Sequence, residues 1–183
     1  MKNFKRRNLL FSLCGLNCGL CPMYLGNYCP GCGGGEGNQS CAIAKCSIEH
    51  NKIEYCSQCS CFPCEKYKDI DSYDSFITHR NRMKDFERIK ELGIDKYNAE
   101  QKEKIDILKF LLENYNDGRK KTFFCLSVNL LDLQDLKNIM NQIKDNEEIN
   151  KLTLKEKSNY ITRLFRDVAL KKNIKLKLYK KST

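Results

Sequence analysis

The sequence predicts a mainly α protein with little β structure, in which an N-terminal cysteine-rich module is stabilised by metal and packed on a small α-helical domain. Eleven of the twelve cysteines lie between Cys14 and Cys64. That segment is rich in Gly and Pro and has little hydrophobic periodicity, so we expect something other than an apolar core to shape it. From residue 71 onward, apolar residues recur at helical spacing. We therefore expect two domains, residues 1–70 and residues 71–183.

The cysteines of the first segment are grouped mainly in C-x2-C pairs. Such a turn presents two sulfurs to one metal, and both zinc and iron–sulfur sites take thiolate ligands. The pairs are Cys18/Cys21, Cys29/Cys32, Cys56/Cys59 and Cys61/Cys64, and the remaining cysteines of the segment are Cys14, Cys41 and Cys46. In the cytoplasm, where thiols stay reduced, this density favours metal binding over disulfides.

The number of metal sites stays open. Eleven cysteines and one further ligand would make three four-ligand sites, with His50 or Cys125 as the twelfth ligand. The alternative is two sites with spare or bridging thiols. A single residue joins the pairs Cys56/Cys59 and Cys61/Cys64, so we expect these pairs to serve different sites or one shared cluster.

The identity of the metal also has two interpretations. The "CPGCG" turn beginning at Cys29 is typical of the knuckles of zinc ribbons, where Pro and Gly set the turn. Zinc, as two or three ions, is therefore the preferred cofactor. The alternative is an iron–sulfur cluster, because Cys14-x3-Cys18-x2-Cys21 has the spacing used for [4Fe–4S] clusters by radical S-adenosylmethionine enzymes. That likeness ends there, since the chain is too short and too helical for their barrel.

The later segments have helical signals. We expect helices over about 72–92, ended by Gly93, and over about 98–115, opened by an Asn98–Gln101 capping box. Two short helices or one bent helix follow around residues 121–143, with Asp132 as an N-cap. A Thr153–Glu156 capping box opens the last helix. The alternation in "NIKLKLYKK" predicts a strand, and "NLLFSL" is its candidate partner.

The positive charge is concentrated at the C-terminal end, where residues 151–183 hold eleven Lys and Arg against two Asp and Glu. Anion binding, and hence a nucleic-acid or protein partner, is possible through these lysines: Lys171, Lys172, Lys175, Lys177, Lys180 and Lys181. Aromatic residues do not interleave with them, apart from Tyr179, so base stacking is not favoured.

Other function classes are not favoured by the sequence. No apolar stretch approaches the length of a membrane span, and the apolar run Leu9–Leu13 is too short for a signal peptide, so we expect a cytoplasmic protein. Neither histidine has the neighbours of a catalytic triad. A non-enzymatic metal-binding module is therefore the preferred function, with an iron–sulfur protein in electron transfer or redox enzymology as the alternative.

The order of the motifs "CGLNCGLCPMY", "CPGC", "CAIAKC" and "YCSQCSCFPCEKY" resembles an uncharacterised cysteine-rich family of bacteria and archaea, classed as a domain of unknown function. The resemblance covers most of the chain and is most specific between Cys14 and Glu65. It implies a metal-binding cysteine domain with all eleven clustered cysteines as ligands, and it implies no particular reaction. The "CSCFPC" segment departs from the motif, so one of Cys59 and Cys61 is the extra cysteine.

Overall fold

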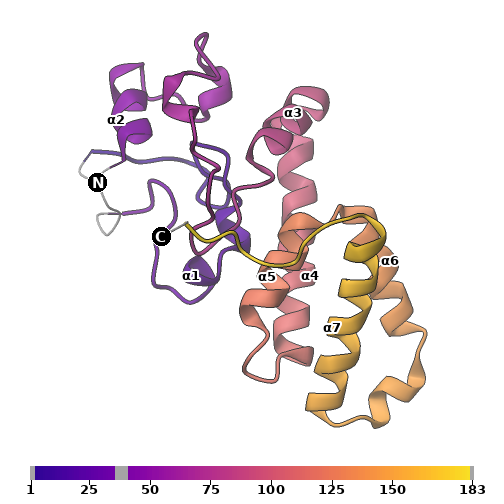
Figure 1. Ribbon diagram of the computed structural model, residues 1–183. Coiled ribbons are helices and arrows are strands. Elements are labelled where there is room, and N and C mark those ends of the chain that lie inside the picture. Colours follow the sequence, from indigo (N-terminus) through magenta and orange to yellow (C-terminus); the bar gives the residue numbers. More distant parts are fainter. Residues whose placement is uncertain (1–2, 36–40, 182–183) are drawn as a thin grey trace. The chain divides into compact units, whose positions relative to one another are not determined.

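The computed structural model describes residues 3–35 and 41–181. These residues are mainly helical and contain no strand, which confirms the mainly α prediction and leaves the predicted β structure unobserved in them. The α-helices, labelled in Figure 1, are α1 (Pro22–Leu25), α2 (Ala42–Glu49), α3 (Arg82–Leu92), α4 (Ile94–Tyr115), α5 (Lys121–Leu130), α6 (Leu133–Lys144) and α7 (Leu154–Lys171). Short 3-10 helices occur at Cys18–Leu20, Cys56–Gln58, Glu65–Tyr67 and Glu147–Lys151.

The chain divides into two compact units. The first comprises Met1–Tyr97 and Leu178–Thr183, and the second comprises Asn98–Lys177. The first unit thus extends beyond the predicted boundary at residue 70 and includes α3 and the start of α4. The reason is packing, because Phe86 of α3 and Tyr97 of α4 belong to the apolar core of the first unit.

That core is larger than the sequence led us to expect. Phe11 is almost fully buried, and its ring lies 5.7 Å from that of Tyr55, 5.8 Å from that of Phe86 and 5.1 Å from that of Tyr97. Aromatic pairs in tilted and edge-on arrangements stabilise a core beyond the area they bury. The cysteine-bearing loops therefore pack against a hydrophobic core. Its residues are Phe4, Phe11, Leu13, Ile43, Ala44, Tyr55, Cys56, Phe86 and Tyr97.

The helix predicted over 72–92 is correct only in its second half. Its C-terminal end is as predicted, at Gly93, which has a φ of 82°. Before Arg82 the chain instead forms turns around Asp74, whose carboxylate accepts from the Thr78 hydroxyl and, at 2.8 Å, from the His79 backbone N–H. Because the Asp74 carboxylate accepts from these donors, this segment is stabilised without the backbone hydrogen bonds of a helix.

The predicted strand pairing between the two ends of the chain is wrong. Residues 8–13 form turns, because the Asn8 side chain accepts from the N–H groups of Leu10 and Phe11, which a strand partner would otherwise use. Near the other end, Tyr179 pairs with Asp74 instead. The Asp74 N–H donates to the Tyr179 carbonyl at 2.7 Å, and the Tyr179 N–H donates to the Asp74 carboxylate at 2.8 Å.

In the second unit, α6 and α7 pack together. The predicted Asp132 N-cap position and the Thr153–Glu156 capping box are both present at the starts of these helices. The Asn98–Gln101 cap is not, because α4 already begins at Ile94, directly after Gly93. Among the described residues, no helix combines the length and the apolar character needed to cross a bilayer.

Candidate metal centres

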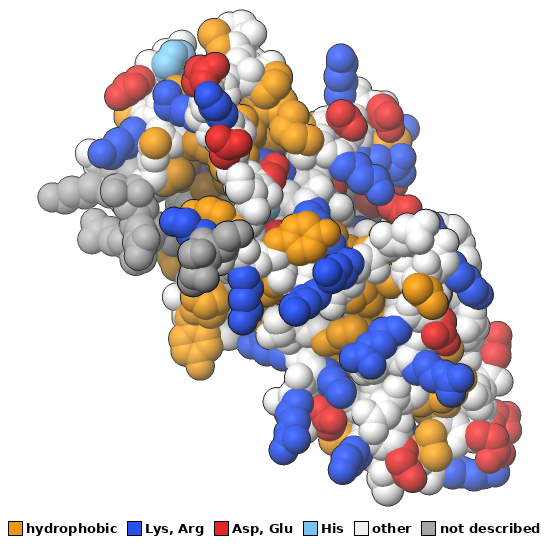
Figure 2. Space-filling model, in the orientation of Figure 1, with side chains coloured by type: hydrophobic (Ala, Val, Ile, Leu, Met, Phe, Trp, Pro, Cys, Tyr) orange, Lys and Arg blue, Asp and Glu red, His pale blue; other side chains and the backbone are white. Residues whose placement is uncertain are grey.

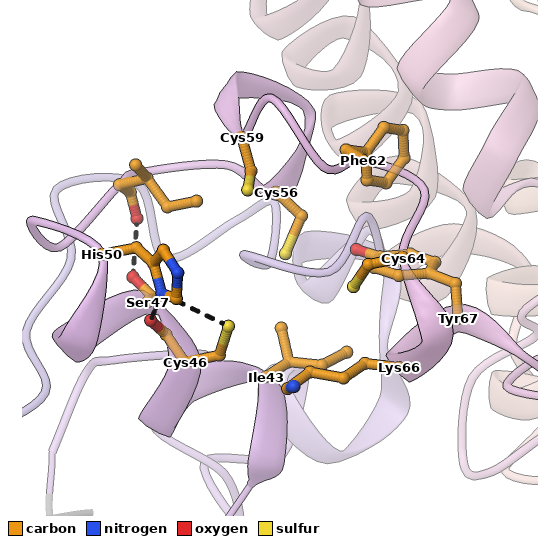
Figure 3. A pocket seen from close by; sticks show the side chains of 11 residues that line it. Ile43, Cys46, Ser47, His50, Cys56, Cys59, Phe62, Cys64, Lys66 and Tyr67 are labelled. Atoms are coloured by element: carbon orange, nitrogen blue, oxygen red, sulfur yellow. Dashed lines mark hydrogen bonds between the residues drawn. The ribbon is translucent and has the colours of Figure 1, made fainter.

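Four cysteines surround a small cavity in the first unit, which we call site A. Cys46 belongs to α2. Cys56 begins the 3-10 turn Cys56–Gln58, and Cys59 directly follows it. Cys64 directly precedes the 3-10 turn Glu65–Tyr67. In Figure 3 the four sulfur atoms point toward the space between these segments. The cavity has a volume of about 30 Å³, and Ile43, Ile53 and Phe62 form much of its apolar wall.

Local hydrogen bonds hold the loops of site A. The Gln58 side-chain oxygen accepts from the N–H groups of Glu54 and Tyr55, at 2.9 and 3.0 Å, which fixes the turn between Cys56 and Cys59. The Phe62 ring lies 4.9 Å from the rings of both Tyr67 and Phe86. This packing anchors the segment leading to Cys64 on the aromatic core.

Five further cysteines line a larger cavity of about 220 Å³, which we call site B. They are Cys14, Cys18, Cys29, Cys32 and Cys41. The turn that carries Cys29 and Cys32 depends on two glycines in the left-handed region, Gly31 at φ 83° and Gly33 at φ 86°. A Cβ at Gly33 would lie 2.8 Å from the Cγ of Arg6, so only glycine fits there without displacing that side chain.

Each site has a thiol whose pKa is raised by burial and by neighbouring thiols. Burial raises the pKa of Cys18 to about 12, with the thiols of Cys32, Cys14 and Cys21 adding to the increase. The backbone N–H of Cys32 donates to the Cys18 sulfur and acts in the opposite direction. In an empty site such thiols keep their protons, and a bound metal must displace them because the thiolate is the ligand.

At site A, burial likewise raises the pKa of Cys56 to about 12, and the thiols of Cys14, Cys64 and Cys46 add to the increase. The buried Tyr67 hydroxyl has no hydrogen-bond partner among the described residues, and its presence beside Cys56 opposes part of the increase in the pKa of that thiol.

The cysteines that line the two cavities are candidate ligands and do not yet form a metal-holding group. Zinc holds four sulfurs about 2.3 Å from itself. In the described part of the chain, no group of three or more His, Cys, Asp or Glu side chains is placed to hold a metal ion. The metal centres, and the zinc-ribbon form of the module with them, therefore stay predictions.

Three of the predicted cysteines line neither cavity. Cys21 is buried at the start of α1, where it neighbours Cys18, and Cys61 is exposed. Cys125 lies buried in α5 of the second unit. All twelve cysteines lie in the described ranges, and none forms a disulfide. Cys64 thus joins Cys56 and Cys59 around one cavity, without its sequence partner Cys61.

His50 lines site A but is oriented by Cys46. Its Nδ1 lies 2.8 Å from the Cys46 carbonyl oxygen and 3.6 Å from the Cys46 sulfur. Because a carbonyl only accepts, Nδ1 carries the proton in this contact and is not available to a metal. This contact fixes the ring against the Cys46 loop, and Nε2 stays the ring nitrogen that a metal would use.

The C-terminal lysines are distributed over both units. Lys171, Lys172, Lys175 and Lys177 belong to the second, and Lys180 and Lys181 to the first. Lys172 Nζ lies 2.7 Å from the Asp135 carboxylate and 3.4 Å from that of Asp132, and the hydrogen bond to Asp135 raises its pKa. Figure 2 shows Lys and Arg along α7 and the C-terminal segment, with acidic side chains among them on the helices. Part of this positive charge is therefore already paired.

Comparison with protein-family models, with curated proteins and with solved structures found no match. The function is accordingly argued from the geometry of the two sites.

Proposed function

We propose that this chain is an iron–sulfur protein that binds one polynuclear cluster at site A and one at site B, and that it transfers electrons. The observation that carries the proposal is the arrangement at site A, where four thiols from three segments of the chain line one small cavity with a largely apolar wall. A [4Fe–4S] cluster takes four cysteine thiolates. Cys46, Cys56, Cys59 and Cys64 supply that number, and site B offers five.

The surroundings of the thiols suit an electron carrier. Hydrogen bonds to sulfur and exclusion of solvent are the main means by which a protein sets the potential of a cluster. The Cys32 N–H donates to the Cys18 sulfur, and the Leu13 N–H donates to the Cys32 sulfur. Apart from the thiols, site A has only His50, Lys66, Ser47 and Tyr67 as polar lining residues, and His50 is already engaged with Cys46.

Zinc is the second candidate, and one observation at site B favours it. The "CPGCG" turn has the left-handed glycines that a zinc knuckle requires. With zinc at either site the module would be structural, and the C-terminal lysines would be the proposed contact for a protein or nucleic-acid partner.

The test is to purify the protein without oxygen and to measure iron, acid-labile sulfide and zinc per chain together with the visible spectrum. Two [4Fe–4S] clusters predict about eight iron and eight sulfide per chain. Cys59→Ser should halve both, because it removes a ligand of site A. Cys61→Ser is the matched control, since Cys61 lies in the same loop but lines neither cavity. Zinc without sulfide, or equal losses in the two variants, would contradict the proposal.

A further inference from the structure

The two sites share a wall. Ile43 lines both cavities, and its residue is 8% exposed. Helix α2 also carries a cysteine of each site, with Cys41 at its N-cap in site B and Cys46 in site A. The two are five residues apart, which is about 7.5 Å along a helix axis. Ile43 is thus common to the walls of both cavities, and α2 connects the two groups of thiols.

Two further contacts tie the sites together. The Cys56 N–H donates to the Leu13 carbonyl at 2.9 Å, which joins a site A cysteine directly to a residue of the site B wall. The Arg6 guanidinium donates to the Glu54 carbonyl at 2.7 and 3.1 Å, two residues before Cys56, and to the Cys32 carbonyl at 3.4 Å. The loops of the two sites are therefore held in a fixed relation by backbone contacts.

Cys14 lies next to the contact between the two sites. It lines site B, and it follows Leu13, whose carbonyl accepts from the Cys56 N–H of site A at 2.9 Å. Its position follows from its backbone, because its carbonyl accepts from the buried Arg82 guanidinium at 3.1 Å. Cys14 is the cysteine that both centres would share as a neighbour.

We propose that sites A and B form a two-centre electron relay, in which one electron moves directly between the clusters past Ile43 and Cys14. This inference rests on the proposed function. In each transfer one cluster is oxidised by one electron and the other is reduced by one electron, and no bond is made or broken. External one-electron carrier proteins supply and remove the electron, one at each end of the relay.

The test is electron paramagnetic resonance of the protein reduced with dithionite under anaerobic conditions. Two reduced clusters in cavities that share a wall residue should interact magnetically, so the spectrum of the loaded protein should be split or broadened. A splitting that stays constant in field units between two microwave frequencies identifies this interaction in the wild-type protein alone. A spectrum that scales with frequency throughout would overturn the relay.

Single-site variants give an independent comparison. Cys59→Ser should leave only site B reducible, and Cys29→Ser should weaken site B. The sum of their two spectra should differ from the wild-type spectrum, whereas Cys61→Ser should reproduce it. A wild-type spectrum equal to that sum, with iron present at both sites, would refute the relay and leave the proposed function intact. A lack of iron would refute the proposed function itself, and zinc at either site would also refute the relay because zinc has no redox chemistry.

Discussion

Arg6 and Arg7 are adjacent in sequence and opposite in environment, and they allow a sharp test of how the cysteine module is held together. The Arg6 side chain is 2% exposed and makes an ion pair with Glu54, at 3.4 Å. It donates to the carbonyls of Asn8 and Phe11, at 3.1 and 2.9 Å, as well as to that of Glu54. Arg7 is exposed.

The expected effect of Arg6→Met follows from these acceptors. A buried acceptor that loses its donor costs about 1–3 kcal/mol, so three carbonyls at the lower bound cost about 3 kcal/mol. The methionine fills most of the vacated volume and adds no donor. Arg7→Met should change the free energy of unfolding by less than about 0.5 kcal/mol, as is usual for an exposed substitution.

The measurement is urea unfolding of the metal-free protein, followed by near-ultraviolet circular dichroism. This signal includes the aromatic core around Phe11, Tyr55 and Tyr97, which lies in the first unit. Equal midpoints for Arg6→Met and Arg7→Met would show that the Arg6 contacts are not what holds these loops.

Three other predictions concern single positions. Gly33→Ala should reduce metal content sharply, because the new Cβ would clash with Arg6 at a residue whose φ is 86°. Gly118→Ala is the control and should leave metal content unchanged, because Gly118 has a similar φ of 88° but open space around it. Metal analysis of both variants tests this prediction. His79 has a pKa lowered by burial and by Arg82, so the folded state binds fewer protons than the unfolded state. The stability that His79 contributes should be complete above pH of about 6.5 and decline as the pH falls below it. The urea midpoint should therefore fall less over that range in His79→Gln than in the wild type, and equal declines would contradict this. Thr153→Ala should lower helix stability by about 1 kcal/mol through loss of its capping box, and a thermal melt in which the variant matches the wild type would contradict this.

The sequence predicted those parts of the fold that depend on local signals. Gly93 ends a helix and the Thr153–Glu156 box begins one, because each acts on its own few residues. The prediction failed where a distant partner decides the local structure. Asp74 replaces a helical turn by accepting from His79 and Tyr179, and no periodicity around residue 74 signals that competition.

The site was predictable in its ligands but not in their grouping. The density of cysteines indicates metal binding. The sequence does not indicate, however, that Cys64 lies with Cys56 and Cys59 around one cavity while Cys61 is exposed. The His79 side chain is 12% exposed and lies in a segment that the sequence predicts as helix and the structure forms as turns. Nothing in the sequence indicated that the Arg6 side chain is buried, because two adjacent arginines near the N-terminus are typical of an exposed segment.

The reciprocal hydrogen bonds between Asp74 and Tyr179 have a topological consequence. The chain leaves the first unit after Tyr97 and re-enters it at Leu178, so the second unit is an insertion within a discontinuous domain. A truncation after residue 97 would therefore cut away part of the cysteine domain as well as the helices. A minimal version of that domain has to keep both pieces, with residues 97 and 178 joined by a linker and the residue pair 74/179 preserved.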